Sequence, residues 1–518
     1  MPDALDARAV SKVTGMSVSA RLNRVTVFSG LVAVALVAVA SLVDSGDRGT
    51  SPVPTSSREA TTQVAKPDSP LDIVDTSTTQ APIEVSRRLF TAAPVAVLAA
   101  PTDPEAQRIA ILAAAGLGAP VLLDGPDVPG ELDRLGATTV LTFGPTQAVP
   151  GAQVVALDEA AASSAVARLR SVVTVAGPGT TDAVVLTRSE QENAAAAATA
   201  RNAGATVLEL PSADPRTDPA AASYLAEHPA QPVIALGSAF AQLAYPLDVV
   251  RSDLQQPTGG WFALGDKTYT AMYGHPGAPQ LGVLGEQGVG ASVKRAQRLV
   301  RKYERVGKRK FVPMFEIIAT VASSSAGKDK DYSAEAKIAT LTPLIDAAEK
   351  AGIYVVLDLQ PGRTDFLTQA KRYRSLLARP HVGLALDPEW RLTRKQKHLV
   401  QIGSVTAEEI NRTSAWLADL TRDNHLPQKM FVLHQFASSM IKHRGRVDTS
   451  RPELATVIHV DGSGPQGAKQ GTWKTLRRNA PADVGWGWKN FVDEDSPMLN
   501  ARETWRQVRP HPDLVTYQ

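Results

Sequence analysis

The C-terminal half of the chain contains short apolar runs that each end in polar side chains. The clearest of these runs are FVPMFE (311–316), IYVVLDLQ (353–360), HVGLALDPEW (381–390), MFVLHQF (430–436) and TVIHVDG (456–462). Strands that are covered on both faces read as continuous apolar runs. Because helical segments separate the runs, the pattern predicts a parallel α/β sheet, open or closed into a barrel. In such folds the chemistry lies at the carboxyl ends of the strands, where the polar residues fall here.

Residues 253–518 have the length and pattern of a barrel domain. About seven strands alternate with helices over roughly 250 residues, the usual size of a (β/α)8 barrel. We therefore predict a TIM-barrel-like domain here, with an open doubly wound sheet as the alternative. The pattern leaves the eighth strand unplaced: either it lies within 495–518 or the barrel is incomplete.

Residues 88–252 are rich in alanine and contain one pattern twice. The first copy consists of VAVLAA (95–100), a helix (105–117), GAPVLLDG (118–125) and TTVLTFG (138–144). The second copy consists of AVVLTR (183–188), a helix (191–203), GATVLELP (204–211) and PVIALG (232–237). Each copy predicts a parallel α/β layer, and SVVTVAG (171–177) is expected to add a strand between them.

This duplicated pattern resembles the bacterial cell-wall-binding repeat of type 2. The matching pieces are the apolar strand VAVLAA, the turn and helix PTDPEAQRIAILAAAG, the strand LGAPVLLDG and the strand TTVLTFG. The family's phenylalanine-proline-aspartate-alanine turn is replaced by Pro101–Glu105 and Ser189–Glu192. The resemblance implies binding of anionic wall polymer, and the alternative is an α/β spacer without a ligand.

The N-terminal region predicts a membrane anchor. Residues 25–43, VTVFSGLVAVALVAVASLV, carry no charge and span about 28 Å as a helix, nearly the thickness of the hydrocarbon core. Basic residues gather in 1–24, so we expect a cytoplasmic tail there, a single-pass signal anchor, and the later domains outside the cell membrane. The alternative is a signal peptide cleaved near Ala40, followed by secretion. Residues 44–87 are rich in Ser, Thr and Pro and predict a disordered stalk.

Composition excludes several kinds of chemistry. The chain has no Cys, so it has no disulfide, thiolate metal site or Cys nucleophile. A net charge of +3 over 518 residues does not indicate bulk nucleic-acid binding. The high Ala, Val and Arg content is typical of a bacterial protein with GC-rich coding sequence.

Carboxylates at the strand ends are the candidate catalytic groups. Strand alternation places Asp387 and Glu389 on one side, and Asp358 and Asp461 follow other strands in the same way. Glycoside hydrolysis requires an acid, a second carboxylate and an aromatic face for the sugar. The residues expected to bind substrate beside them are Tyr273, His275, Glu316, Gln360, Gln435 (with His434 as its alternative), Trp486 and Trp488.

The segment Asp387-Pro388-Glu389 resembles the end of the fourth strand in chitinase-like barrel hydrolases, which reads Asp-x-Asp-x-Glu. Ala385 stands in place of the first Asp. The resemblance implies that Glu389 is the acid and that Asp387 assists the N-acetyl group of the substrate. It also implies that Trp488 lies beneath the sugar.

Structural roles are the alternative for each of these residues. Asp387 could pair with Arg391 or Arg394, and Asp461 could simply begin a DGSG turn. The Trp residues and His434 could belong to the core. His275, His434 and His459 lie on separate strands, so a metal site with Asp358 is conceivable. No H-x-H or HExxH spacing supports it, and we predict no metal and no cofactor.

Together these patterns predict an extracytoplasmic envelope protein with a glycoside-hydrolase-like barrel that acts on envelope polysaccharide. The alternative is a non-catalytic wall-binding or scaffold protein. The expected partners are cell-wall polysaccharide and, through the N-terminal helix, the membrane, with no nucleic acid.

Overall fold

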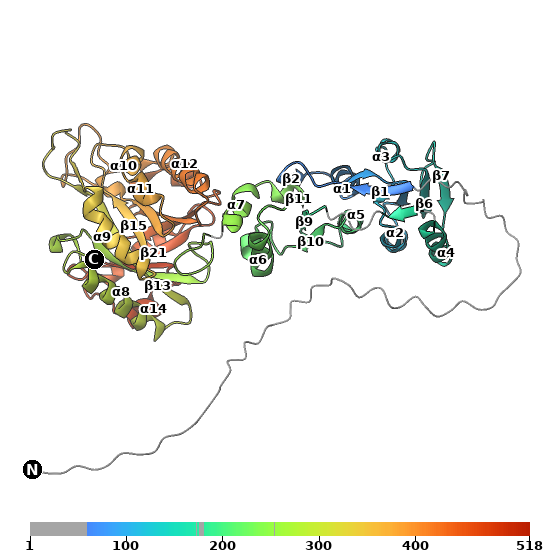
Figure 1. Ribbon diagram of the computed structural model, residues 1–518. Coiled ribbons are helices and arrows are strands. Elements are labelled where there is room, and N and C mark those ends of the chain that lie inside the picture. Colours follow the sequence, from blue (N-terminus) through green and yellow to red (C-terminus); the bar gives the residue numbers. More distant parts are fainter. Residues whose placement is uncertain (1–59, 172, 176–180, 253) are drawn as a thin grey trace, which may run out of the picture. The chain divides into compact units, whose positions relative to one another are not determined.

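The computed structural model describes residues 60–171, 173–175, 181–252 and 254–518 (Figure 1). Among these residues, no helix combines the length and the apolar character needed to cross a membrane. The prediction of a membrane anchor is corrected accordingly. Both the span 25–43 and the cleavage site near Ala40 lie outside the described residues, and the alternative of secretion gains no support either.

The duplicated region forms two four-stranded parallel sheets with the same internal order. The first sheet has the order β5-β4-β6-β7 and the second β10-β9-β11-β2, so in each copy the first strand lies between the second and the third. The first copy comprises β4 (Val95–Ala99), α2 (Pro104–Leu117), β5 (Val121–Leu123), α3 (Val128–Leu135), β6 (Thr139–Phe143), β7 (Gln153–Ala156) and α4 (Glu159–Arg170). The second comprises β9 (Val184–Thr187), α5 (Ala194–Asn202), β10 (Thr206–Glu209), α6 (Pro219–Glu227), β11 (Val233–Leu236) and α7 (Ala244–Ser252).

Part of the predicted stalk is folded, so the prediction of disorder over 44–87 is wrong from Ala60 onward. This part contains β1 (Ala60–Val64), β2 (Leu71–Val74) and α1 (Ala81–Leu89). Strand β2 completes the second sheet beside β11, and β1 lies between β3 (Phe90–Ala92) and β8 (Val173–Val175). These strands are short, and they pair with strands far along the chain. The local sequence pattern therefore does not reveal them. The extra strand expected in 171–177 is β8.

Residues 267–517 contain a closed parallel barrel. Its strands are β12 (Lys267–Gly274), β13 (Lys310–Ala322), β15 (Tyr354–Leu359), β16 (Val382–Leu386), β18 (Lys429–His434), β20 (Leu454–Val460), β21 (Gly485–Asn490) and β22 (Leu514–Tyr517). The barrel closes because β12 pairs with both β13 and β22. The prediction of a barrel rather than an open sheet is confirmed. The eighth strand, which the sequence left unplaced, is β22, so the barrel is complete. A short strand, β14 (Ser333–Glu335), adds antiparallel to β13.

Helices connect the barrel strands and cover their outer faces (Figure 1). They are α8 (Val289–Glu304), α9 (Ile338–Lys350), α10 (Phe366–Arg372), α11 (Arg374–Leu377), α12 (Ala407–Asp423), α13 (Gln466–Leu476) and α14 (Ala501–Gln507). Thr406 caps the N-terminus of α12, because its side chain accepts a hydrogen bond from the Glu409 amide.

Strand alternation divides the barrel side chains into two cores. Those facing the helices include Phe315, Leu357 and Leu384. Those facing the barrel interior form a separate apolar cluster, which includes Met314, Val356, Ala385, Val432 and Val457. The strands are therefore apolar on both faces, which explains their unbroken runs in the sequence.

Candidate functional site

The barrel interior changes from apolar to polar at the carboxyl ends of the strands. Two residues beyond the interior residues Met314 and Val356 come Glu316 and Asp358, and the other strands follow the same alternation. The resulting polar layer takes one residue from each strand or its immediate end, and its members are Tyr273, Glu316, Asp358, Asp387, His434, His459, Lys489 and Thr516. All of these residues are buried.

His434 lies between two carboxylates at the centre of this layer. Its Nε2 is 2.7 Å from Oε1 of Glu316, and its Nδ1 is 2.9 Å from Oδ2 of Asp461. Burial opposes a charge on the ring, but Glu316 and Asp461 outweigh it and raise the pKa of His434 well above its usual range. Glu316 also accepts a hydrogen bond of 2.9 Å from the Thr516 hydroxyl through its other oxygen, Oε2.

Asp358 and Tyr273 form a second set of contacts. The Tyr273 hydroxyl donates to Oδ2 of Asp358 at 2.7 Å and accepts from Nε2 of Gln360 at 3.1 Å. Lys489 lies over the same ring, with Nζ 3.7 Å from its centroid. Burial, with the negative charge of Glu316 adding to it, raises the pKa of Asp358 to about 6.

Asp387 and Glu389 follow β16 directly, which is the fourth strand of the barrel. Asp387 caps a short 3-10 turn (Pro388–Trp390) by accepting a hydrogen bond from the Glu389 amide. Burial raises the pKa of Asp387 well above its usual range. Glu389 is partly exposed, and burial together with the negative charge of Asp461 raises its pKa to about 7.

The alternative in which Asp387 pairs with a neighbouring arginine is not what the structure shows. Arg391 pairs with Glu409 instead, with Nε 2.9 Å from Oε1. Among the described residues, neither Asp387 nor Glu389 forms an ion pair, and the Glu389 carboxyl group makes no hydrogen bond.

Five of the residues expected to bind substrate are not members of the polar layer, although one of them, Gln360, donates a hydrogen bond to the Tyr273 hydroxyl. His275 Nδ1 is 2.8 Å from the carbonyl of Ile318. Gln435 accepts a hydrogen bond from Arg444 and donates to a loop carbonyl, while His434 enters the layer. The remaining two are Trp486 and Trp488, whose rings pack against Trp473 of α13 on the outer face of the barrel.

Sequence reasoning missed Lys489 and Thr516, and it considered His459 only as a metal ligand. The segment GWGWKN held a signal for Lys489, because its alternate positions are Gly485, Gly487 and Lys489. A Cβ atom added to Gly487 would lie 2.5 Å from the His459 ring, so the inward position beside His459 has no room for a side chain.

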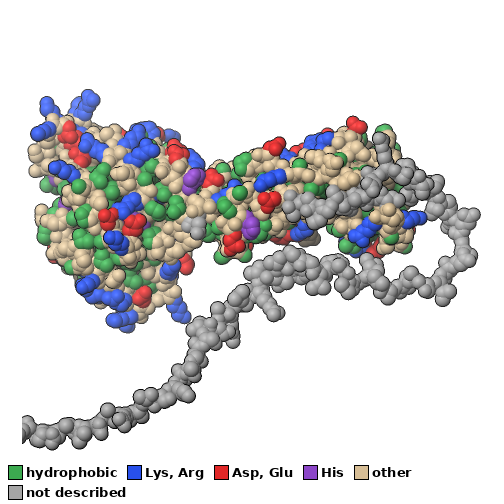
Figure 2. Space-filling view, in the orientation of Figure 1, with side chains coloured by type: hydrophobic (Ala, Val, Ile, Leu, Met, Phe, Trp, Pro, Cys, Tyr) green, Lys and Arg blue, Asp and Glu red, His purple; other side chains and the backbone are tan. Residues whose placement is uncertain are grey.

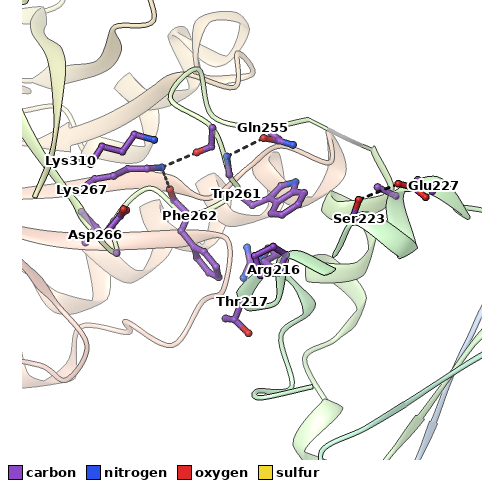
Figure 3. Close-up of a pocket in the computed structure, with 16 residues that line it drawn as sticks. Arg216, Thr217, Ser223, Glu227, Gln255, Trp261, Phe262, Asp266, Lys267 and Lys310 are labelled. Atoms are coloured by element: carbon purple, nitrogen blue, oxygen red, sulfur yellow. Dashed lines mark hydrogen bonds between the residues drawn. The ribbon is translucent and has the colours of Figure 1, made fainter. Parts of the chain in front are cut away.

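A cavity of about 930 Å³ lies at the opposite, amino-terminal end of the barrel strands. Its lining includes Lys267 and Lys310, the first residues of β12 and β13, and Trp261 (Figure 3). Lys267 Nζ donates to the carbonyls of Phe262, at 2.7 Å, and Gly259, at 3.2 Å. Catalysis on parallel barrels occurs at the carboxyl ends of the strands, so we assign no catalytic role to this cavity.

Basic and acidic side chains are interspersed over the visible face of the described residues (Figure 2). No family model matches the chain, and no curated protein matches it. One matching solved structure is "Cwp6 from Clostridium difficile", which is 13% identical to this chain. The match covers 67% of this chain and 66% of that one, with a TM-score of 0.17. Similarity of this degree indicates nothing about function.

Proposed function

We propose that the barrel is a glycoside hydrolase in which Glu389 is the general acid and Asp461 is the second carboxylate. The observation that carries this proposal is the contrast between the two side chains at the carboxyl-terminal rim of the barrel. Glu389 is partly exposed and its carboxyl group has no hydrogen-bond partner among the described residues. Asp461 is buried and forms a hydrogen bond with His434.

The electrostatics of the two carboxyl groups support these roles. Burial and the charge of Asp461 raise the pKa of Glu389 to about 7, so a substantial fraction of the molecules keep this proton at neutral pH. Burial opposes ionisation of Asp461 as well, but the positive charge and hydrogen bond of His434, together with the charge of Lys489, hold its pKa below the usual range. Two carboxyl groups with opposite pKa shifts are the usual arrangement of an acid and its partner.

The reaction follows from these protonation states. Glu389 transfers its proton to the leaving glycosidic oxygen as the bond to the sugar breaks. The ionised Asp461 stabilises, or attacks, the positively charged sugar centre that forms. Asp387 positions Glu389 by capping its turn. Trp390, partly exposed beside Glu389, offers the sugar an aromatic face, whereas Trp486 and Trp488 pack on the outer face of the barrel.

The proposed substrate is bacterial cell-wall polysaccharide, because the duplicated region resembles wall-binding repeats. The test is the release of reducing ends from purified wall polysaccharide by the whole chain and by Glu389→Gln. We expect the variant to lose about 100- to 10,000-fold in rate, the usual contribution of a general acid. Glu408→Gln is the matched control, because the Glu408 side chain is 54% exposed and lies at the start of α12.

Equal activity in Glu389→Gln would rule out its role as the acid. If the unchanged protein releases no reducing ends yet sediments with the polysaccharide, the barrel is a non-catalytic binder. Thermal unfolding of each variant, followed by circular dichroism, shows whether a loss of activity reflects a loss of fold.

A further inference from the structure

His459 is a buried histidine whose ring makes no ordinary hydrogen bond. Its relative exposure is 0%, and neither ring nitrogen has a hydrogen-bond partner among the described residues. Leaving a buried polar group without a partner is energetically unfavourable. Buried imidazoles of this kind are usually held by an acceptor, a donor or a metal ion.

The ring of His459 faces two other potential metal ligands. Its Nδ1 lies 3.7 Å from Oε1 of Glu316, which in turn lies 2.7 Å from Nε2 of His434. These three atoms all lie within 4.8 Å of one another. Oδ1 of Asp358 is 3.8 Å from His434 Nε2 and also has no hydrogen-bond partner among the described residues. Three donor atoms from three strands therefore lie close together, and Oδ1 of Asp358 lies beside one of them.

Hydrogen bonds from residues outside the ligand cluster orient two of these ligands as a metal ion requires. Asp461 binds Nδ1 of His434 and leaves Nε2 facing Glu316. Thr516 binds Oε2 of Glu316 and leaves Oε1 facing the two rings. Histidines that ligate a metal almost always carry a carboxylate or carbonyl on their other nitrogen, as His434 does.

We propose that Glu316, His434 and His459 form a binding site for a divalent transition metal ion of the zinc type, with Asp358 as a fourth ligand. Two imidazoles with carboxylates suit zinc and its neighbours in the first transition row better than calcium or magnesium, which prefer oxygen ligands. The ion replaces the proton shared between His434 Nε2 and Glu316 Oε1. It also offsets part of the negative charge that the carboxylates bring into the barrel.

This site could not be predicted from spacing, because each ligand comes from a different strand: β13, β15, β18 and β20. The metal site and the proposed hydrolase site are joined by the contact between His434 and Asp461, but their tests are separate. Glu389 is not among the ligands, and metal binding is measured without substrate, so the failure of one proposal leaves the other standing.

The test is zinc titration of the whole chain after dialysis against a chelator. We expect about one zinc ion per chain by isothermal titration calorimetry, and the same content by elemental analysis after gel filtration. His459→Ala should abolish stoichiometric binding. Asp329→Asn is the control, because Asp329 belongs to a second acidic group, with Asp331 and Glu335, that is largely outside the barrel interior. Binding that survives His459→Ala or depends on Asp329 would overturn the proposal.

A second measurement avoids the possibility that His459→Ala does not fold. Crystals of the unchanged protein grown with zinc should show an anomalous scattering peak between Glu316, His434 and His459. Cobalt added to the unchanged protein should give the visible absorption bands of a site with nitrogen ligands. If the peak is elsewhere, or there is neither a peak nor visible bands, the site does not bind metal.

Discussion

The two ends of the barrel bury charged groups in opposite ways. At the amino-terminal end, Lys429 has no exposed surface, and its Nζ donates to the carbonyls of Arg379 and Val382 at 2.8 Å each. At the carboxyl-terminal end, Oδ1 of Asp358 and Oδ1 of Asp461 are buried without a hydrogen-bond partner among the described residues. A buried group whose partners are backbone atoms stabilises the fold. A buried group with an unused atom is available to a ligand.

Burial itself acts in the same way at both ends. It disfavours the charged form of any side chain, so it lowers the pKa of a base and raises that of an acid. Burial lowers the pKa of Lys429 to about 7, and it raises the pKa of Asp358 to about 6. The ends differ in the contacts of these groups, which makes the comparison testable by substitution.

The largest expected effect on stability is at the amino-terminal end. Lys429→Ala leaves two buried carbonyls without their donor and opens a cavity, so we expect the free energy of unfolding to fall by about 2–5 kcal/mol. Urea denaturation measures this change. Lys442→Ala, at an exposed position, is the control and should change stability by less than about 0.5 kcal/mol. In contrast, Glu389→Gln removes no hydrogen bond and should leave stability nearly unchanged. Equal losses in Lys429→Ala and Glu389→Gln would remove the distinction between the two ends.

The pH dependence of activity should reflect the carboxyl-terminal end. The general acid must be protonated, and the pKa of Glu389 is about 7, so activity should fall as the pH rises through this value. The decline is about tenfold per pH unit once Glu389 is ionised. The low-pH limb of the pH–rate profile, where Asp461 becomes protonated, should lie below about pH 4. The reason is that the pKa of Asp461 is held below its usual range. Rates of reducing-end release across this range measure both limbs. A constant rate up to pH 9 would exclude Glu389 as the acid.

A smaller effect is expected from crowding the polar layer. Gly487→Ala places a Cβ atom 2.5 Å from the His459 ring and 3.1 Å from its Cα atom. Relief of this overlap should cost about 1–3 kcal/mol of stability and displace His459. Gly471→Ala in α13 is the matched control. A Cβ atom there meets nothing within 4 Å, so it should stabilise the helix by up to about 1 kcal/mol. Thermal unfolding compares the two, and a neutral Gly487→Ala would show that the layer has spare volume.

The local pattern of the sequence was sufficient to predict most elements of the barrel and of the duplicated region. Continuous apolar runs located the strands. The same runs placed Asp358, Asp387 and Glu389 at the carboxyl ends of strands. In a parallel sheet these ends all lie at the same edge, so polar residues that follow buried strands share that edge. The folded part of 44–87 was missed because its strands pair with partners that are distant in sequence.

Only the tertiary structure decided which side chains meet. The strands are apolar on both faces, so alternation defines two sets of residues without showing which set faces inward. On β21 the inward set is Gly485, Gly487 and Lys489, and the tryptophans pack against α13. Closure through β22 then brings Thr516 to Glu316, 200 residues away in the chain. The sequence by itself determined where the strands end and which of them end in carboxylates. The barrel decided which of these groups share one interior, because that depends on strand order, register and closure.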